Sequence, residues 1–145
     1  MKKFRPKERR RARELAMQAI YQWQMTEESP LEIEVQFHQN NNMSKVDVEY
    51  FAAILRGVTQ NTQDIDHLIL SAANRTLKDL NPVELALLRV AVYEFLFEKD
   101  VPYKVVINEA LEMAKKFGAI EGFKYVNGVL DTIAQHVFLG KELPS

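Results

Sequence analysis

The chain has 145 residues, of which 47% are hydrophobic and 27% charged, so it can bury a core as one compact domain. It contains no cysteine, which excludes disulfides, a thiolate nucleophile and cysteine-ligated zinc. No apolar run approaches the roughly 20 residues that cross a bilayer. The N-terminal region also lacks the apolar core of a signal peptide, so the expected location is the cytoplasm.

Charge is divided unevenly along the chain. Residues 1–13 contain eight Lys or Arg and one Glu, a net charge of +7, whereas the remaining residues contain eleven Lys or Arg and nineteen Asp or Glu, a net of −8. A run of like charge is typical of a segment that binds a polyanion, so nucleic acid is the first partner to expect. The acidic remainder leaves room for a second, basic partner. We expect residues 1–8 to form a flexible basic arm, residues 9–139 one helical domain and residues 140–145 a tail.

Helical periodicity dominates the first part of the chain. Over residues 9–25, apolar side chains recur at spacings of three and four, which predicts a helix with one buried stripe. Residues 29–32, Ser-Pro-Leu-Glu, form a capping box that starts a second, short helix, and the three asparagines at 40–42 end it. A third helix is expected to begin near residues 44–47 and to continue through Val58.

Two further starts follow in the middle of the chain. Asn61 and Thr62 can cap a fourth helix. Residues 81–84, Asn-Pro-Val-Glu, combine a cap, a proline and a reaching carboxylate, which is the strongest start signal in the sequence. The helix after it, to about residue 97, is apolar nearly all round, so we expect it at the centre of the fold.

The last part of the chain predicts two more helices. Residues 100–102, Asp-Val-Pro, open a sixth helix that Gly118 ends, and a seventh carries apolar side chains between Val126 and Val137. No segment shows the alternation of a strand. The sequence therefore predicts an all-α fold, a compact bundle of about seven helices in two halves of three to four helices, at about residues 9–60 and 61–139.

Residues that could carry catalysis form no recognisable pattern. The three histidines lie on separate segments, and no phosphate-binding loop, dinucleotide glycine motif or nucleophile elbow is present. Glu94 with Glu98, and Glu109 with Glu112, fall on common helix faces, but an ordinary solvated face explains each pair. We therefore expect no enzyme activity, metal or cofactor.

The first binding signal is the basic N-terminal run. On a helical wheel Tyr21 lies opposite the buried stripe, near Arg10, Met17 and Arg13. Arginine binds phosphate, and an exposed aromatic ring can stack on an unpaired base, so the combination favours single-stranded RNA. The alternatives for Tyr21 are packing beneath the adjacent loop and contact with another protein.

The second binding signal is the segment 115–125, in which three lysines alternate with three aromatic residues around two glycines. Glycine permits close approach of the backbone to a ligand, and the amide groups of the next helix start attract anions. Phe117 and Phe123 could instead close the core at this turn. Glu121 disfavours phosphate, so contacts to bases or sugars are expected there.

Together these segments resemble the family of bacterial transcription antitermination factors called NusB. The resemblance lies in short stretches, in order from residue 9 to residue 131: RRRARE at 9–14, AIYQWQ at 19–24, VE at 83–84, LR at 88–89, YE at 93–94, DVPYKV at 100–105, INEA at 107–110, AK at 114–115, FG at 117–118 and KYVNGVLD at 124–131. No single stretch is specific, whereas the whole set is.

The resemblance implies an all-helical protein without catalysis. It also implies binding of the single-stranded boxA element in ribosomal RNA operon transcripts, as a heterodimer with the ribosomal protein NusE. The complex would act with other Nus factors and RNA polymerase against premature termination. Some family members form homodimers, and the sequence leaves this open here. The alternative function is a non-catalytic protein-interaction module whose basic arm docks an acidic partner.

The candidate site residues combine both binding signals with the resemblance. Those expected to contact RNA are Lys2, Lys3, Arg5, Lys7, Arg9, Arg10, Arg11, Arg13, Tyr21, Phe117, Gly118, Lys124 and Tyr125. Tyr21 and Glu84 are the candidates for contact with the protein partner. The apolar residues 137–139 have no counterpart in the family, and they could pack on the domain or mediate self-association.

Overall fold

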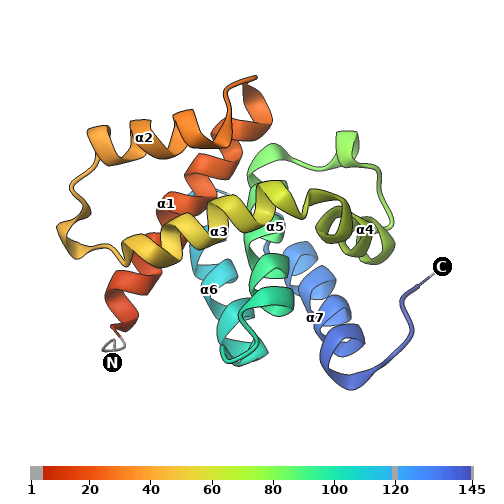
Figure 1. Ribbon diagram of the computed structural model, residues 1–145. Helices are drawn as coiled ribbons and strands as arrows, with labels where there is room; N and C mark the ends of the chain where they lie inside the picture. The colour runs from red at the N-terminus through yellow and green to blue at the C-terminus, as the bar shows by residue number, and fades with distance from the viewer. Residues whose placement is uncertain (1–4, 119–120, 145) are drawn as a thin grey trace.

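The computed structural model describes residues 5–118 and 121–144, and it contains seven α-helices and no strand in those ranges (Figure 1). The α-helices are α1 (Pro6–Met25), α2 (Pro30–Asn40), α3 (Val48–Gln60), α4 (Thr62–Ala73), α5 (Pro82–Phe97), α6 (Tyr103–Lys116) and α7 (Phe123–Leu139). Two short 3₁₀ turns, η1 (Met43–Lys45) and η2 (Leu77–Asp79), lie in connections and were not expected from the sequence. The predicted all-α bundle of about seven helices is confirmed.

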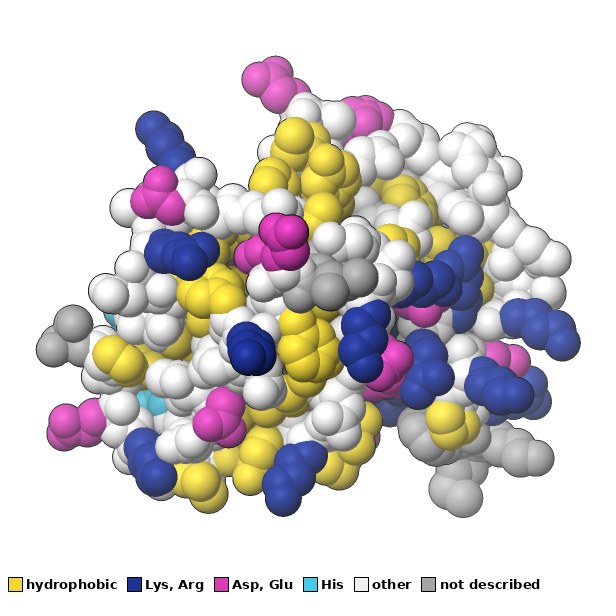
Figure 2. All heavy atoms as spheres, turned by 180° about the vertical axis from the view of Figure 1, so that it is seen from behind, with side chains coloured by type: hydrophobic (Ala, Val, Ile, Leu, Met, Phe, Trp, Pro, Cys, Tyr) yellow, Lys and Arg dark blue, Asp and Glu magenta, His cyan; other side chains and the backbone are white. Residues whose placement is uncertain are grey.

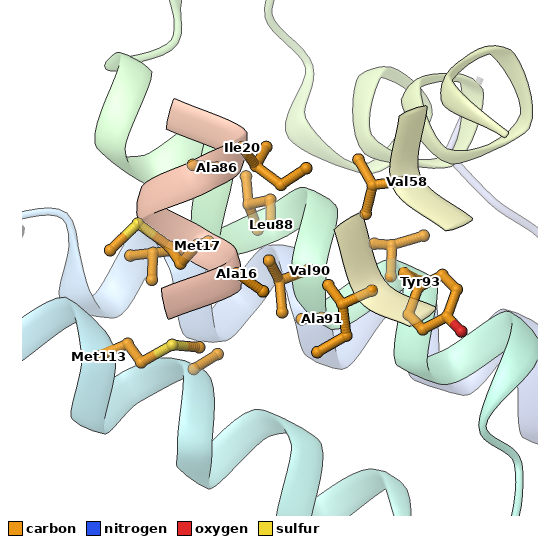
Figure 3. Close-up of a cluster of buried hydrophobic side chains, with 14 of the residues drawn as sticks. Ala16, Met17, Ile20, Val58, Ala86, Leu88, Val90, Ala91, Tyr93 and Met113 are labelled. Carbon is orange, nitrogen blue, oxygen red and sulfur yellow. The ribbon is translucent and has the colours of Figure 1, made fainter. Parts of the chain in front are cut away.

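Helix α5 forms the centre of the bundle. Every residue of α5 from Leu85 to Phe95 is buried, which matches its apolar character on all sides. It contacts α1, α3, α4, α6 and α7, and the core is one continuous cluster of buried side chains. Figure 3 shows side chains of α5 close to Met17 and Ile20 of α1, with Met113 of α6 in the same buried cluster. Because helices from both expected halves share this core, the boundary near residue 60 stays a prediction.

Helix ends follow the local signals in the sequence. The Asn81 side chain accepts a hydrogen bond from the backbone N–H of Val83 at 2.8 Å, and Pro82 occupies the first helical turn of α5. The Ser29 hydroxyl likewise accepts from the N–H of Glu32 at 3.2 Å at the start of α2. Gly118 follows α6 with a positive φ of 84°, a conformation that favours glycine and ends the helix.

Helix α1 begins earlier than the apolar pattern predicts. It starts at Pro6, with Arg5 as its N-cap, rather than at Arg9. Proline at the first helical position is compatible with helix, and the polar first turn carries no apolar residue that the periodicity could detect. Residues 6–8 of the expected arm are therefore helical, while residues 1–4 lie outside the described residues.

The apolar residues near the C-terminus pack on the domain. The Phe138 ring stacks on Tyr103 of α6 with centroids 5.4 Å apart, and it meets Phe95 of α5 edge-on at 5.8 Å. Val137 also packs against the core, while Leu139 is exposed. Two of the three side chains at 137–139 thus complete the bundle, and Gly140 ends α7 in the left-handed conformation.

Candidate nucleic-acid interface

The outer side of α1 presents several of the predicted cations to solvent. Lys7 is exposed, and the side chains of Arg10 and Arg11 are 59% and 41% exposed. Arg10 donates from Nε to both carboxylate oxygens of Glu109 on α6, each at 3.1 Å. This hydrogen bond, with the charge of Glu109, raises the pKa of Arg10. Arg5 is also exposed and donates to Glu8 at 3.1 Å.

Arg13 lies in the interior, which corrects the prediction that it contacts RNA. Its side chain is 4% exposed, and its Nε donates to the two carboxylate oxygens of Glu94 on α5 at 2.9 and 3.0 Å. Its Nη1 donates to Glu109 at 3.2 Å. A phosphate could reach this guanidinium only if α1 separated from α5 and α6. Met17, one turn further on, is buried as well, so the helical wheel places these two residues wrongly, although Arg10 and Tyr21 on the same side are exposed.

Arg9 faces α3 more than solvent. Its guanidinium lies 4.2 Å from the centroid of the Tyr50 ring, and its Nε is 3.9 Å from an Asp47 carboxylate oxygen. The cation–π contact and the ion pair fix α1 against the start of α3. Of the four arginines between residues 9 and 13, all of them candidates for RNA contact, Arg10 and Arg11 are therefore the most exposed.

A buried polar network lies beneath this surface. Glu94 was expected on a solvated face, but it is buried between Arg13 and Tyr50, and the Tyr50 hydroxyl donates to it. Burial raises the pKa of Glu94, while the charge of Arg13 and the bond from Tyr50 favour its charged form. Burial also raises the pKa of Tyr50, and the charge of Glu94 adds to this shift. The network holds α1, α3 and α5 together.

The two basic segments that the sequence singled out meet in space. Lys116, in the last turn of α6, donates from Nζ to Glu14 Oε1 at 3.0 Å, and Arg11 Nη1 donates to the same oxygen at 3.2 Å. Lys115 is exposed beside it and lies 5.4 Å from the centroid of the Phe123 ring. Figure 2 shows a group of Lys and Arg side chains on the right of the rear face, the side on which α1 lies. We call the exposed cations Lys7, Arg10, Arg11, Lys115 and Lys116 the basic surface.

The aromatic candidates at the junction between α6 and α7 are only partly accessible. Phe117 is half-buried and packs against the core, and Lys116 Nζ lies 6.0 Å from its ring centroid. The Tyr125 hydroxyl donates to the carbonyl of Ala73 at 3.2 Å, and the Arg75 guanidinium lies 4.1 Å from the Tyr125 ring centroid. Each ring thus contributes to packing and keeps part of its surface open to solvent.

Three other candidate residues lie at or near the turn between α6 and α7. Gly118 and Lys124 are exposed. Glu84, in the first turn of α5, is half-buried and lies against the backbone of Gly122, where an added methyl group would come within 2.3 Å of Glu84 Oε1. Glu84 also contributes to the raised pKa of Tyr125, after the larger effect of burial. Glu84, a predicted contact for the protein partner, therefore lies beside residues that are predicted to contact RNA.

Tyr21 is exposed on the outer side of α1, as the helical wheel indicates. Met25, one turn later, is exposed as well, so apolar surface continues to the end of the helix. Lys2 and Lys3 lie outside the described residues.

Several residues at the interface were not singled out from the sequence as site residues. Glu14 and Glu109 look like ordinary helical carboxylates, and their importance depends on contacts between residues about a hundred positions apart. Lys115 and Lys116 did carry a signal, because they belong to the lysine-aromatic segment. Arg75 carried none, since only the fold brings it onto Tyr125.

The described residues contain no group of three His, Cys, Asp or Glu side chains that could hold a metal ion. No helix among them is long and apolar enough to cross a membrane. A helical bundle whose exposed cations gather on one surface is typical of the class of proteins that bind a polyanion.

Comparisons with known proteins narrow this class to one family. The model of the NusB family matches residues 10–135. The transcription antitermination protein NusB of Pasteurella multocida (strain Pm70) is 50% identical over 133 residues, which cover 92% of this chain and 91% of the relative. That of Idiomarina loihiensis is 51% identical over 128 residues, covering 88% and 92%. The chain belongs to the NusB family.

Solved structures show the same fold. A NusB structure from T. maritima superposes with a TM-score of 0.78 at 35% sequence identity and covers 93% of both chains. A structure of the antitermination factors NusB and NusE in complex with double-stranded RNA superposes with a TM-score of 0.76 at 27% identity, covering 87% of this chain and 95% of the other.

Proposed function

We propose that the chain is a transcription antitermination factor that binds boxA RNA of ribosomal RNA operon transcripts together with the ribosomal protein NusE. It acts in the cytoplasm with other Nus factors and RNA polymerase, and it performs no catalysis of its own. Membership of the NusB family supports the antitermination role. The relative solved with NusE and RNA supports the two partners.

The single observation that carries the RNA proposal is the pair of hydrogen bonds that Glu14 accepts. This carboxylate accepts hydrogen bonds from Arg11 and from Lys116, which joins the N-terminal cations to the segment 115–125. Phosphates follow one another along an RNA strand, so a strand needs several cations in one continuous surface. Two separate patches of cations would not offer a strand such a continuous surface.

The proposed division of labour follows from exposure. Cations of the basic surface, together with Arg5, Arg9 and Lys124, hold phosphates. Lys2 and Lys3, which lie outside the described residues, are proposed to do the same. Phe117, Gly118 and Tyr125 contact bases at the junction. Arg13 is left out because it is buried.

The partner proposal uses the remaining candidates. Tyr21 and Glu84 contact NusE, and the net negative charge of the chain beyond residue 13 steers a basic protein to it. The RNA is proposed to be single-stranded, because unpaired bases can stack on the accessible parts of the aromatic rings. A double-stranded boxA control tests this point, since the RNA in the related complex is double-stranded.

Paired substitutions test the proposed surface. Each single-strand phosphate contact contributes about −0.7 to the slope of log affinity against log salt concentration. The double variant Arg11→Ala with Lys116→Ala should therefore flatten the slope for labelled boxA RNA by about 1.4. The control removes two exposed cations elsewhere, Arg56 of α3 and Lys78 of η2, and should leave the slope unchanged. Equal slopes for both double variants would contradict the proposed surface.

A further inference from the structure

Two nearly buried carboxylates underlie the basic surface, and each binds two cations. Glu109 accepts from Arg10 Nε at 3.1 Å and from Arg13 Nη1 at 3.2 Å. Glu14 accepts from Arg11 Nη1 at 3.2 Å and from Lys116 Nζ at 3.0 Å. The carboxylates are 12% and 11% exposed, whereas Arg10 and Lys116 are 59% and 55% exposed. Each nearly buried carboxylate thus binds at least one cation that faces the solvent.

The anchoring of Glu109 extends into the core. Glu109 shares Arg13 with Glu94, and Glu94 also accepts from the Tyr50 hydroxyl. A continuous chain of charge-assisted hydrogen bonds therefore runs from α3 and α5 through α1 to the surface. Both hydrogen bonds from Arg10 to Glu109 come from Nε, so they leave the N–H groups of its two terminal nitrogens for other acceptors.

We expect these carboxylates to have two opposing effects on RNA binding. Each cancels one positive charge next to the strand, which weakens the sequence-independent attraction of phosphates. Each also limits the positions that its cations can take, so less conformational freedom is lost when a correctly shaped RNA binds. Compared with the same cations without the carboxylates, such a surface should bind polyanions in general more weakly. Its preference for one correctly shaped RNA over other RNAs should be larger.

We propose that Glu14 and Glu109 are positioning residues that make the basic surface selective among RNA sequences. They do so by holding Arg10, Arg11 and Lys116 in place and by suppressing sequence-independent phosphate binding. The inference rests on the proposed function, because it concerns the same RNA surface.

Neutral isosteres provide the test. Glu14→Gln and Glu109→Gln keep the side-chain shape and one acceptor oxygen but remove the charge. Glu34→Gln is a matched control, because Glu34 is a 13% exposed carboxylate that binds the exposed Arg56 at 2.7 Å on another part of the surface. Affinities for labelled boxA RNA and a scrambled RNA are measured on the full-length protein at two salt concentrations.

We expect Glu14→Gln and Glu109→Gln each to tighten binding of the scrambled RNA and to lower the preference for boxA. The salt slope should steepen by about 0.7, the contribution of one additional phosphate contact. Glu34→Gln, with the same change in net charge, should leave the preference unchanged.

A second readout needs no RNA. Nitrogen-15 NMR reports proton exchange of the Arg10 Nε–H and the Lys116 ammonium with water. Faster exchange is expected at Arg10 in Glu109→Gln and at Lys116 in Glu14→Gln. If Glu109→Gln unfolds because Arg13 loses a buried partner, Glu14→Gln still tests the proposal, because its two cations, Arg11 and Lys116, are not buried.

The outcomes separate the two proposals. If the wild-type protein prefers boxA and both variants keep that preference within about twofold, the positioning role is wrong while the proposed function stands. If the wild-type protein binds both RNAs equally, the proposed function fails, and the selectivity inference fails with it.

Discussion

Replacing Arg13 should affect stability, whereas replacing its neighbour Arg10 should affect RNA binding. Both belong to the same arginine-rich run, but Arg13 is 4% exposed and binds Glu94 and Glu109, while Arg10 is 59% exposed. Arg13→Ala would leave the Glu94 carboxylate buried without its counter-charge. Arg10→Ala would leave Glu109 still bound to Arg13.

The expected magnitudes differ severalfold. Breaking a buried ion pair by removing one partner costs about 3–5 kcal/mol. A domain of this size loses roughly 2–4 °C in melting temperature per kcal/mol, so Arg13→Ala should melt about 10 °C lower. An exposed ion pair such as that of Arg10 contributes only about 0–1 kcal/mol.

Thermal and urea unfolding followed by circular dichroism measure the first effect, and fluorescence anisotropy with labelled RNA measures the second. Arg10→Ala should keep its unfolding midpoint and lose about 0.7 from the salt slope of RNA binding. If Arg13→Ala were as stable as Arg10→Ala, or weakened RNA binding while fully folded, the buried position of Arg13 would be wrong.

Three further predictions concern packing, titration and base contacts. Gly57→Ala places a methyl group 2.0 Å from the Tyr93 ring, so overpacking of about 1–3 kcal/mol should lower the unfolding midpoint. The control Gly128→Ala meets no atom within 4 Å and should gain up to about 1 kcal/mol from helix propensity. Because burial raises the pKa of Tyr50, the folded state keeps a proton that the unfolded chain loses near pH ~10. Stability should be intact below that pH and fall above it, and less steeply in Tyr50→Phe, in urea titrations. Phe117→Ala should reduce the preference for boxA over scrambled RNA by about 1–3 kcal/mol in anisotropy titrations.

Each of these has an outcome that would contradict it. Equal midpoints for the two glycine variants would mean that α3 does not press on Tyr93. Parallel loss of stability in wild type and Tyr50→Phe above pH ~10 would remove the role of Tyr50 in alkaline unfolding. For Phe117→Ala, unchanged preference in a protein that melts like wild type would exclude a base contact.

The fold could be predicted from local signals, because helix starts depend on a few adjacent residues. Asn81 and Pro82 begin α5, and the apolar character of that helix on all sides correctly placed it at the centre. The start of α1 could not be placed, since its polar first turn shows no periodicity.

The site was less predictable, because adjacent arginines look alike in sequence. Arg10 and Arg13 differ because α5 and α6 cover Arg13 and leave Arg10 exposed, and these two helices come some eighty to a hundred residues later in the chain. The same holds for Glu14, whose bond to Lys116 joins segments that are far apart in sequence. Exposure of Tyr21 was predictable, since it depends on the wheel of a single helix.

The most direct test of the central claim is the affinity of the full-length protein for labelled boxA RNA and for a scrambled RNA, with and without NusE. The proposed function predicts a preference for boxA that increases when NusE is added and that weakens as salt rises. Equal, weak binding of both RNAs, unchanged by NusE, would contradict it and would leave a protein-interaction module with a basic arm.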